Sequence, residues 1–288
     1  MHQESPLSGD VRLAFLKDFA SQLNTREIDL PPFPDAYARI LAALDDPELS
    51  MDQLAKVITG APELCVRILL MANSALMNRS GVEVTDLNVA VARLGAAAIR
   101  NAAVSLATRE LFETSPDSPW YHQLDAIHTA AITTAAVAYA MAARAGLARA
   151  RDNVMLAGLL HNVGSLYILS KAKAYPQLAN REAMENWGPG IGRAIIENWG
   201  FPKEIAEAVE YQDVREACQP GTTDLRDLLV VSKRLAELRL RQPEDSTGLL
   251  AEWAQAPAFR KLEVSPLNAE LVLEEIDEEV ESFLSAIR

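Results

Sequence analysis

The chain has 288 residues, of which 49% are hydrophobic and 23% charged, and this excludes a disordered protein and provides for one large domain or two small ones. The net charge of −13 argues against a general nucleic-acid-binding surface, because such surfaces depend on Lys and Arg. No signal peptide is evident, and residues 130–143, the most apolar stretch, are too short and alanine-rich to span a bilayer. Cys65 and Cys218 lack CxxC spacing and are expected to be reduced. We therefore expect a cytoplasmic protein.

The N-terminal part of the chain is predicted to form short helices. In residues 10–24, apolar side chains recur at four-residue steps, which predicts an amphipathic helix. It packs either against the rest of the chain, which is the preferred interpretation, or against a partner protein. Residues 30–34 are rich in proline and are expected to be extended. Ser50 and Gln53 match a capping box, and Pro62 suits the first turn of another helix.

A bend and a linker are predicted before the middle of the chain. Thr85 is expected to cap a helix over residues 86–94, and Gly95 marks a bend before a further helix that ends near Phe112. Residues 114–119 are rich in turn-forming side chains. This linker predicts two helical subdomains.

The remaining chain is also predicted to be helical. Residues 121–145 are alanine-rich and indicate a long central helix that lets neighbouring helices approach closely. Residues 152 to about 171 are predicted to form one apolar helix, and shorter helices are expected at 191–198, 202–211 and 225–240. Because no strand-like alternation persists anywhere, the predicted fold class is all-α.

The last segment is strongly acidic. Residues 267–281 contain seven acidic side chains and no basic ones, together with apolar residues at helical spacing. This pattern predicts an acidic amphipathic helix. It either packs against the core, which is the preferred interpretation, or binds a partner protein through Leu271, Ile276, Val280 and Phe283.

Histidines are few. The four are His2, His122, His128 and His161, and only the last two lie in apolar helical patterns. A metal needs several converging donors, and two histidines without a suitably spaced carboxylate do not make a persuasive site. Each of them alone is more often a core histidine than a ligand.

Several ordered motifs nevertheless resemble a known family. The segment Leu159–Gly164, LLHNVG, resembles the LLHD[IV]G motif of HD-superfamily phosphohydrolases, and His128-Thr129 resembles their upstream His-Ser. Other segments resemble the HDOD branch of this superfamily, and the likeness covers roughly residues 25–240. These segments are LPPFP at 30–34, DDP at 45–47, APEL at 61–64, LLMANSA at 69–75, VAVARLG at 89–95 and NWGFP at 198–202.

The sequence departs from the family pattern at the metal ligands. Asn162 replaces the HD aspartate, and a neutral amide holds a hard cation less well than a carboxylate. Gln212 stands where such proteins often carry a histidine pair, and either Ser232 or Lys233 takes the place of the last ligand aspartate. Together, the candidate residues for a degenerate pocket are His128, His161, Asn162, Gln212, Asp213, Ser232 and Lys233.

The resemblance implies an all-α fold in which an N-terminal helical subdomain packs on an HD-like helical core, with extra C-terminal helices. Residues 1–27 are expected to form an N-terminal extension, and residues 28–240 the HDOD domain. Within the latter, 28–113 would be the N-terminal subdomain and 120–240 the core. Residues 241–288 would be an acidic helical extension.

The implied function is that of a non-catalytic bacterial signal-transduction regulator that acts through protein or small-ligand binding. A protein partner is expected, a nucleotide or cyclic dinucleotide is an alternative ligand, and no metal, cofactor, DNA or membrane is expected. One alternative is a metal-dependent phosphohydrolase, such as a cyclic-dinucleotide phosphodiesterase, in which His128 and His161 bind a metal weakly together with Asp125 or Asp213. Another is a nucleic-acid-binding regulator that uses Arg93, Arg100 and Arg109.

Overall fold

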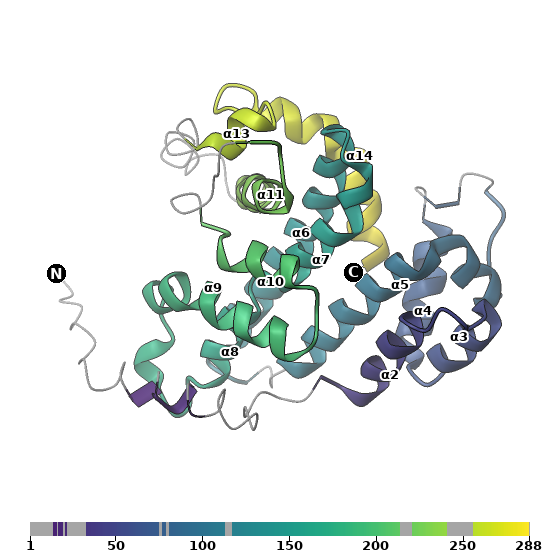
Figure 1. The fold of residues 1–288 in the computed structure, drawn as a ribbon, viewed down its shortest axis with the longest axis horizontal. Helices are drawn as coiled ribbons and strands as arrows, with labels where there is room; N and C mark the ends of the chain where they lie inside the picture. Colours follow the sequence, from purple (N-terminus) through teal and green to yellow (C-terminus); the bar gives the residue numbers. More distant parts are fainter. Residues whose placement is uncertain are drawn as a thin grey trace.

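A computed structural model describes residues 14–15, 17–19, 21, 33–74, 77–78, 81–112, 117–213, 221–240 and 256–287. These residues form helices and contain no strand, which confirms the all-α prediction. Figure 1 shows the N-terminal helices on one side of the molecule and the remaining helices stacked beside them.

Four helices form the N-terminal layer: α2 (Asp35–Leu44), α3 (Met51–Ile58), α4 (Pro62–Asn73) and α5 (Leu87–Leu111). Six helices form the adjoining core: α6 (Tyr121–Arg144), α7 (Arg151–Leu160), α8 (Val163–Ser170), α9 (Arg181–Asn198), α10 (Lys203–Glu210) and α11 (Leu225–Leu240). The C-terminal helices are α13 (Pro257–Lys261) and α14 (Ala269–Ile287), and short 3₁₀ helices lie at Ala148–Ala150 and Pro176–Leu178.

Helix starts in the N-terminal layer follow local side-chain chemistry. The predicted capping box is present, since Ser50 Oγ accepts from the Gln53 amide at 3.3 Å and Gln53 Oε1 accepts from the Ser50 amide at 2.8 Å. Pro62 occupies the first turn of α4 as predicted. The predicted cap of α5 is wrong by one residue, because Asp86 and not Thr85 accepts from the backbone amide of Val89. Gly95 has φ 77° and bends α5.

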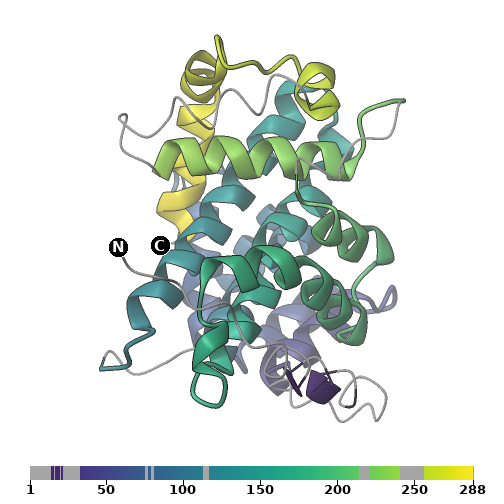
Figure 2. The same cartoon turned by 90° about the vertical axis from the view of Figure 1, so that its left-hand side faces the viewer.

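The central helix of the core is α6, which packs against α7, α11 and α14. Figure 2 shows α11 crossing over this part of the core. The buried face of α6 is mostly alanine, and small side chains let the three neighbours approach closely. The predicted role of residues 121–145 as a central buried helix is therefore confirmed.

Two helix boundaries in the core differ from the sequence prediction. Residues 152–171 form two helices and not one, because the chain breaks between Leu160 and Val163. Helix α9 begins at Arg181 and not near residue 191. The side chain of Asn180 accepts from the backbone amide of Ala183 at 2.9 Å and so caps this earlier start.

Motifs that resemble the HDOD family have structural roles here. Asn73, in the LLMANSA segment, donates to the carbonyl oxygen of Val84 at 2.8 Å and accepts from its amide at 2.8 Å. It thereby fixes the loop between α4 and α5. The ring of Phe33, in the proline-rich segment, contacts Trp199 and Phe201, with centroids 5.4 and 6.1 Å apart. These rings join the N-terminal layer to the core.

Phe15 and Phe19 belong to the predicted N-terminal amphipathic helix. Both are buried, and the ring of Phe15 stacks on Trp187 with centroids 6.0 Å apart. The described part of this segment therefore packs against the core, as predicted. Val11 and Leu23, which complete the predicted apolar face, lie outside the described residues.

Arginines of the core form ion pairs with the acidic C-terminal helix. Arg144 Nε lies 2.9 Å from Glu275 Oε2, and Arg151 pairs with Glu279. Arg239 pairs with two further carboxylates, those of Asp277 and Glu281. These ion pairs connect α14 to α6, α7 and α11. Four of the seven acidic side chains thus contact the protein's own basic residues.

Three helical stretches are long and apolar enough to cross a membrane by length and composition, namely Leu87–Leu111, Tyr121–Arg144 and Ala148–Ser170. The sequence argument based on residues 130–143 is wrong in this respect, because the helix extends well beyond them on the N-terminal side. In the structure, 44%, 56% and 78% of the apolar windows in these stretches are buried inside the protein. They contribute to its helix–helix interfaces.

Candidate functional site

The HD-like motif lies at the break between α7 and α8. His161 ends α7 and Asn162 precedes α8 with φ −101° and ψ 6°. The break turns the chain so that both side chains line a pocket of about 520 Å³. His161 is only 3% exposed, and its Nδ1 lies 2.7 Å from the carbonyl oxygen of Gly158. A proton on Nδ1 makes this contact a hydrogen bond.

The pocket brings together five of the seven predicted pocket residues. His161 and Asn162 come from the α7–α8 break, Gln212 and Asp213 follow α10, and Lys233 comes from α11. The sequence leaves open whether Ser232 or Lys233 takes the position of the last ligand aspartate. The structure places Lys233 on the pocket wall.

Ser232 and His128 lie elsewhere. The side chain of Ser232 is fully buried, and its hydroxyl has no hydrogen-bond partner among the described residues. His128 does not line the pocket. It lies close enough to Arg109, on α5, for the charge of Arg109 to affect its pKa. Burial and then the charge of Arg109 lower the pKa of His128. The structure does not bring His128 and His161 together in this pocket.

A chain of hydrogen bonds holds the inner pocket. Lys233 Nζ donates to Gln212 Oε1 at 3.0 Å, and Gln212 Nε2 donates to the main-chain oxygen of His161 at 2.8 Å. Gln212 is buried, and both its amide oxygen and its amide nitrogen have hydrogen-bond partners inside the protein, as buried polar groups require. We call these three residues the Lys–Gln–His chain. It joins α11 to the HD-like motif through a lysine and an amide.

Electrostatics keep His161 neutral. Burial and the nearby charge of Lys233 lower the pKa of His161 to about 3, against a partial opposing effect of the bond to Gly158. Burial also lowers the pKa of Lys233, and Glu237 and Asp213 act in the opposite direction. The side chain of Lys233 thus occupies the region of the pocket that faces His161.

This low pKa predicts how His161 responds to acid. In the native protein the imidazole is expected to stay neutral as the pH falls from 8 to 4. The unfolded state protonates it near the ordinary value of 6.5. Between about pH 6.5 and 3, His161 therefore makes stability fall as the pH falls, by up to about 1.4 kcal/mol per pH unit. Nuclear magnetic resonance of the imidazole nitrogens tests this, with the urea-denatured protein as control. Titration of native His161 near pH 6 would contradict it.

Sequence reasoning missed several charged residues of the pocket wall. Arg181 and Glu185 form an i,i+4 ion pair, and Arg234 pairs with Glu237. The first pair was missed because α9 is predicted to begin near residue 191. The first pair has i,i+4 spacing and the second has i,i+3 spacing. Both spacings are visible in the sequence, and correct helix boundaries would have predicted the two ion pairs.

The donor set does not fit a metal centre. The described residues contain no group of three or more His, Cys, Asp or Glu side chains that could hold a metal ion. Near His161 the pocket presents the amides of Asn162 and Gln212 and the ammonium of Lys233. Hard divalent cations bind oxygen-rich, negatively charged sites, and no reaction step through a metal is derived from this arrangement.

The candidate partner-binding face of α14 is mostly buried. Ile276, Val280 and Phe283 lie in the core, whereas Leu271 is 59% exposed. Three of the four predicted partner residues are therefore unavailable to another protein in this conformation. The arrangement agrees with the preferred interpretation of a helix that packs on the core.

The predicted basic residues do not share one face. Arg93 donates to the main-chain oxygen of Ala72 at 3.2 Å, and Arg100 pairs with Asp45. Arg109 lines a different pocket near the N-terminal layer. Each of the three arginines thus has its own surroundings, and the described structure gives no combined basic surface from them.

The comparisons with known proteins agree with the fold and its motifs. A family model for the HDOD domain matches residues 30–214, which is more than half of the chain. The chain belongs to the HDOD family. A crystal structure from Shewanella amazonensis SB2B, whose name assigns it provisionally to the metal-dependent phosphohydrolases, is 25% identical with a TM-score of 0.74. The match covers 95% of this chain and 99% of that one.

Two other relatives are more distant. A crystal structure from Marinobacter aquaeolei VT8, named provisionally as a signal transduction protein, is 24% identical with a TM-score of 0.61, covering 98% of this chain and 66% of that one. An uncharacterized protein of Treponema pallidum (strain Nichols) is 22% identical over 211 residues, or 67% of this chain. The chain spans 39% of the length of that curated relative. At this identity the Marinobacter structure supports the fold alone.

Proposed function

We propose that this protein is a non-catalytic bacterial signal-transduction regulator in the cytoplasm, and that its HD-like core binds a protein or small ligand without hydrolysing it. The observation that carries the proposal is the Lys–Gln–His chain. Lys233 is one of the two residues, with Ser232, that the family resemblance aligns with a metal-ligand aspartate, and its side-chain nitrogen is hydrogen-bonded to Gln212 inside the pocket. Membership of the HDOD family agrees with a regulatory role.

The charge of Lys233 opposes a divalent metal at this place. A single and a double positive charge about 4 Å apart repel by on the order of 8 kcal/mol at an effective dielectric constant of about 20. Asn162 and Gln212 add no negative charge to offset this repulsion. The ammonium instead supplies an internal positive charge that stabilises the pocket without a metal.

The pocket keeps features that suit binding. It has an open volume of about 520 Å³, within the range of small-molecule sites. Lys233 provides a charged donor, and Asp213 and Glu237 provide acceptors on the same wall. Binding there would bias the contacts of α10 and α11, and a partner protein would detect the change.

Restoring the HD aspartate tests the proposal. Asn162→Asp alone is not expected to bind Mn²⁺, because Lys233 still repels the ion and no cluster of acidic donors is formed. Elemental analysis after Mn²⁺ incubation and gel filtration measures this, beside a phosphodiesterase assay with a chromogenic diester. The Asn162→Asp, Lys233→Asp double variant removes the cation and adds a second carboxylate, so it is expected to retain more Mn²⁺ than the single variant.

Two results would contradict these expectations. Stoichiometric metal in the unmodified protein, with diesterase turnover that His161→Ala abolishes, would establish a metal-dependent hydrolase. Stoichiometric Mn²⁺ in Asn162→Asp alone would show that Lys233 does not block the site. The first outcome would overturn the non-catalytic assignment, and the second would overturn the argument that Lys233 excludes a metal.

A further inference from the structure

A second, larger pocket lies in the N-terminal layer and shares no residue with the HD-like pocket. It has a volume of about 690 Å³ between α2, α4 and α5. Small-molecule sites typically have volumes of about 300–1,000 Å³. The size therefore suits a ligand as large as a nucleotide.

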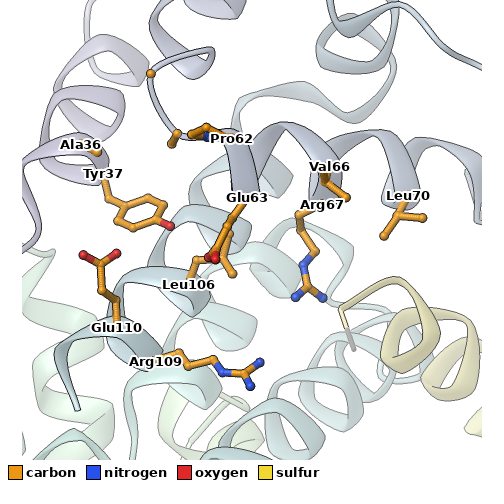
Figure 3. Close-up of a pocket in the computed structure, with 12 residues that line it drawn as sticks. Ala36, Tyr37, Pro62, Glu63, Val66, Arg67, Leu70, Leu106, Arg109 and Glu110 are labelled. Carbon is orange, nitrogen blue, oxygen red and sulfur yellow. The ribbon is translucent and has the colours of Figure 1, made fainter. Parts of the chain in front are cut away.

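Two arginines converge at one end of this pocket. Figure 3 shows Arg67 descending from α4 and Arg109 extending from α5 toward the same space. Burial and then the charge of Arg109 lower the pKa of Arg67, while Glu63 opposes this effect. Two guanidinium groups from different helices form a fork-like donor array, and such arrays match the oxygens of phosphate.

Arg109 differs from the other arginines of its helix. Arg93 and Arg100 are also on α5, and each has a protein acceptor, the oxygen of Ala72 and the carboxylate of Asp45. Within the described part of the chain, Arg109 forms no salt bridge. Its guanidinium is thus available to an incoming anion.

The opposite end of the pocket is acidic. In Figure 3 the carboxylate of Glu110 lies beside Tyr37, and that of Glu63 points into the space between Tyr37 and Arg67. Burial and the charges of Glu110 and Glu63 raise the pKa of Tyr37 to about 12. The phenol therefore stays protonated. The carboxylate of Glu110 at this end and that of Glu63, between this end and Arg67, are the acceptors. They suit a ligand group that donates hydrogen bonds, such as an amine.

Apolar side chains line the walls between these two ends. Val66 and Leu70, on α4, are 59% and 54% exposed, and Leu106 faces them from α5. Exposed aliphatic groups around a hollow provide contact area for a flat, weakly polar ring. The pocket thus combines phosphate recognition, an apolar middle and an amine-accepting end.

We propose that this pocket binds a nucleotide that carries a phosphate and an exocyclic amine, with the phosphate between Arg67 and Arg109 and the amine toward Glu63 and Glu110. The chemistry is that of AMP. IMP lacks the exocyclic amine and adenosine lacks the phosphate, so the three compounds test the two ends of the pocket separately.

Isothermal titration calorimetry with the full chain tests the assignment. AMP is expected to bind with 1:1 stoichiometry, and IMP and adenosine at least about tenfold more weakly, because each leaves a charged group without its partner. Arg109→Gln is expected to weaken AMP by about tenfold or more, with Arg67→Gln as a second variant. Glu110→Gln should reduce the preference for AMP over IMP.

Two control variants locate the site. Arg149→Gln makes the same charge change at an exposed position outside both pockets, and it is expected to leave AMP binding unchanged. Lys233→Met alters the HD-like pocket and should also leave it unchanged. Absence of AMP binding at millimolar concentration would overturn the proposal. So would equal binding of AMP by the unmodified protein and Arg109→Gln, or loss of binding in Lys233→Met alone, which would place the nucleotide in the core.

Discussion

Replacing Gly164 with alanine is expected to lower the free energy of unfolding by about 3 kcal/mol, because α8 and α9 touch backbone to backbone at this point. A Cβ added to Gly164 would lie 2.0 Å from the carbonyl oxygen of Gly188 and 2.6 Å from the amide nitrogen of Gly192. Backbone atoms cannot move aside as a flexible side chain does. The two helices would have to separate.

Gly190→Ala provides the matched control. Gly190 is on α9, between Gly188 and Gly192, and a Cβ there meets no atom within 4 Å. Because Gly190 is exposed inside a helix, alanine there is expected to raise the free energy of unfolding slightly, by no more than about 1 kcal/mol. Urea denaturation followed by circular dichroism measures both variants. Equal stability of Gly164→Ala and Gly190→Ala would show that α8 and α9 are not packed as closely as described.

The second large effect is expected at the ion pair between Lys261 and Asp227. Lys261 Nζ lies 2.7 Å from Asp227 Oδ2, and the two side chains are only 16% and 3% exposed. Lys261→Met would leave the Asp227 carboxylate buried without its cation. Removal of one partner of a buried pair typically costs about 3–5 kcal/mol, so we expect a loss of about 3 kcal/mol in the free energy of unfolding.

Two comparisons isolate the cause of that loss. Arg181→Met removes a cation from the exposed pair with Glu185, whose side chains are 77% and 56% exposed, and it should cost less than about 1 kcal/mol. The Lys261→Met, Asp227→Leu double variant removes both charges and should recover part of the loss. If Lys261→Met costs no more than Arg181→Met in the same denaturation experiment, the pair contributes little to stability.

Local chemistry allowed much of the fold to be predicted. The capping box at Ser50 and the bend at Gly95 depend on side chains within a few residues of each other, so sequence patterns report them. The break between α7 and α8 was not predicted, because the apolar pattern continues through it. Close by, Gly164 on α8 packs backbone to backbone against α9, a contact that sequence patterns do not report.

The site was harder to predict than the fold, because it depends on which way each helix faces. Gln123, Ile127, Ala130 and Thr134 line the HD-like pocket at helical spacing on α6. His128 follows Ile127 and is rotated about 100° from it around the helix axis, so it does not line the pocket. The same uncertainty of helix rotation left Ser232 and Lys233 as alternatives. Only the packing of α6 and α11 in three dimensions distinguishes them.

The match to the HDOD family ends at residue 214, but the apolar interior of the molecule continues beyond it. Leu228 and Val231 on α11, Phe259 on α13, and Val272 and Val280 on α14 belong to the same buried cluster as the alanines of α6. A chain cut at residue 214 would expose this cluster to water and leave an apolar surface that promotes aggregation. The segment that matches the family is therefore smaller than the segment that shares this buried interior, and Lys233 lies only in the larger one.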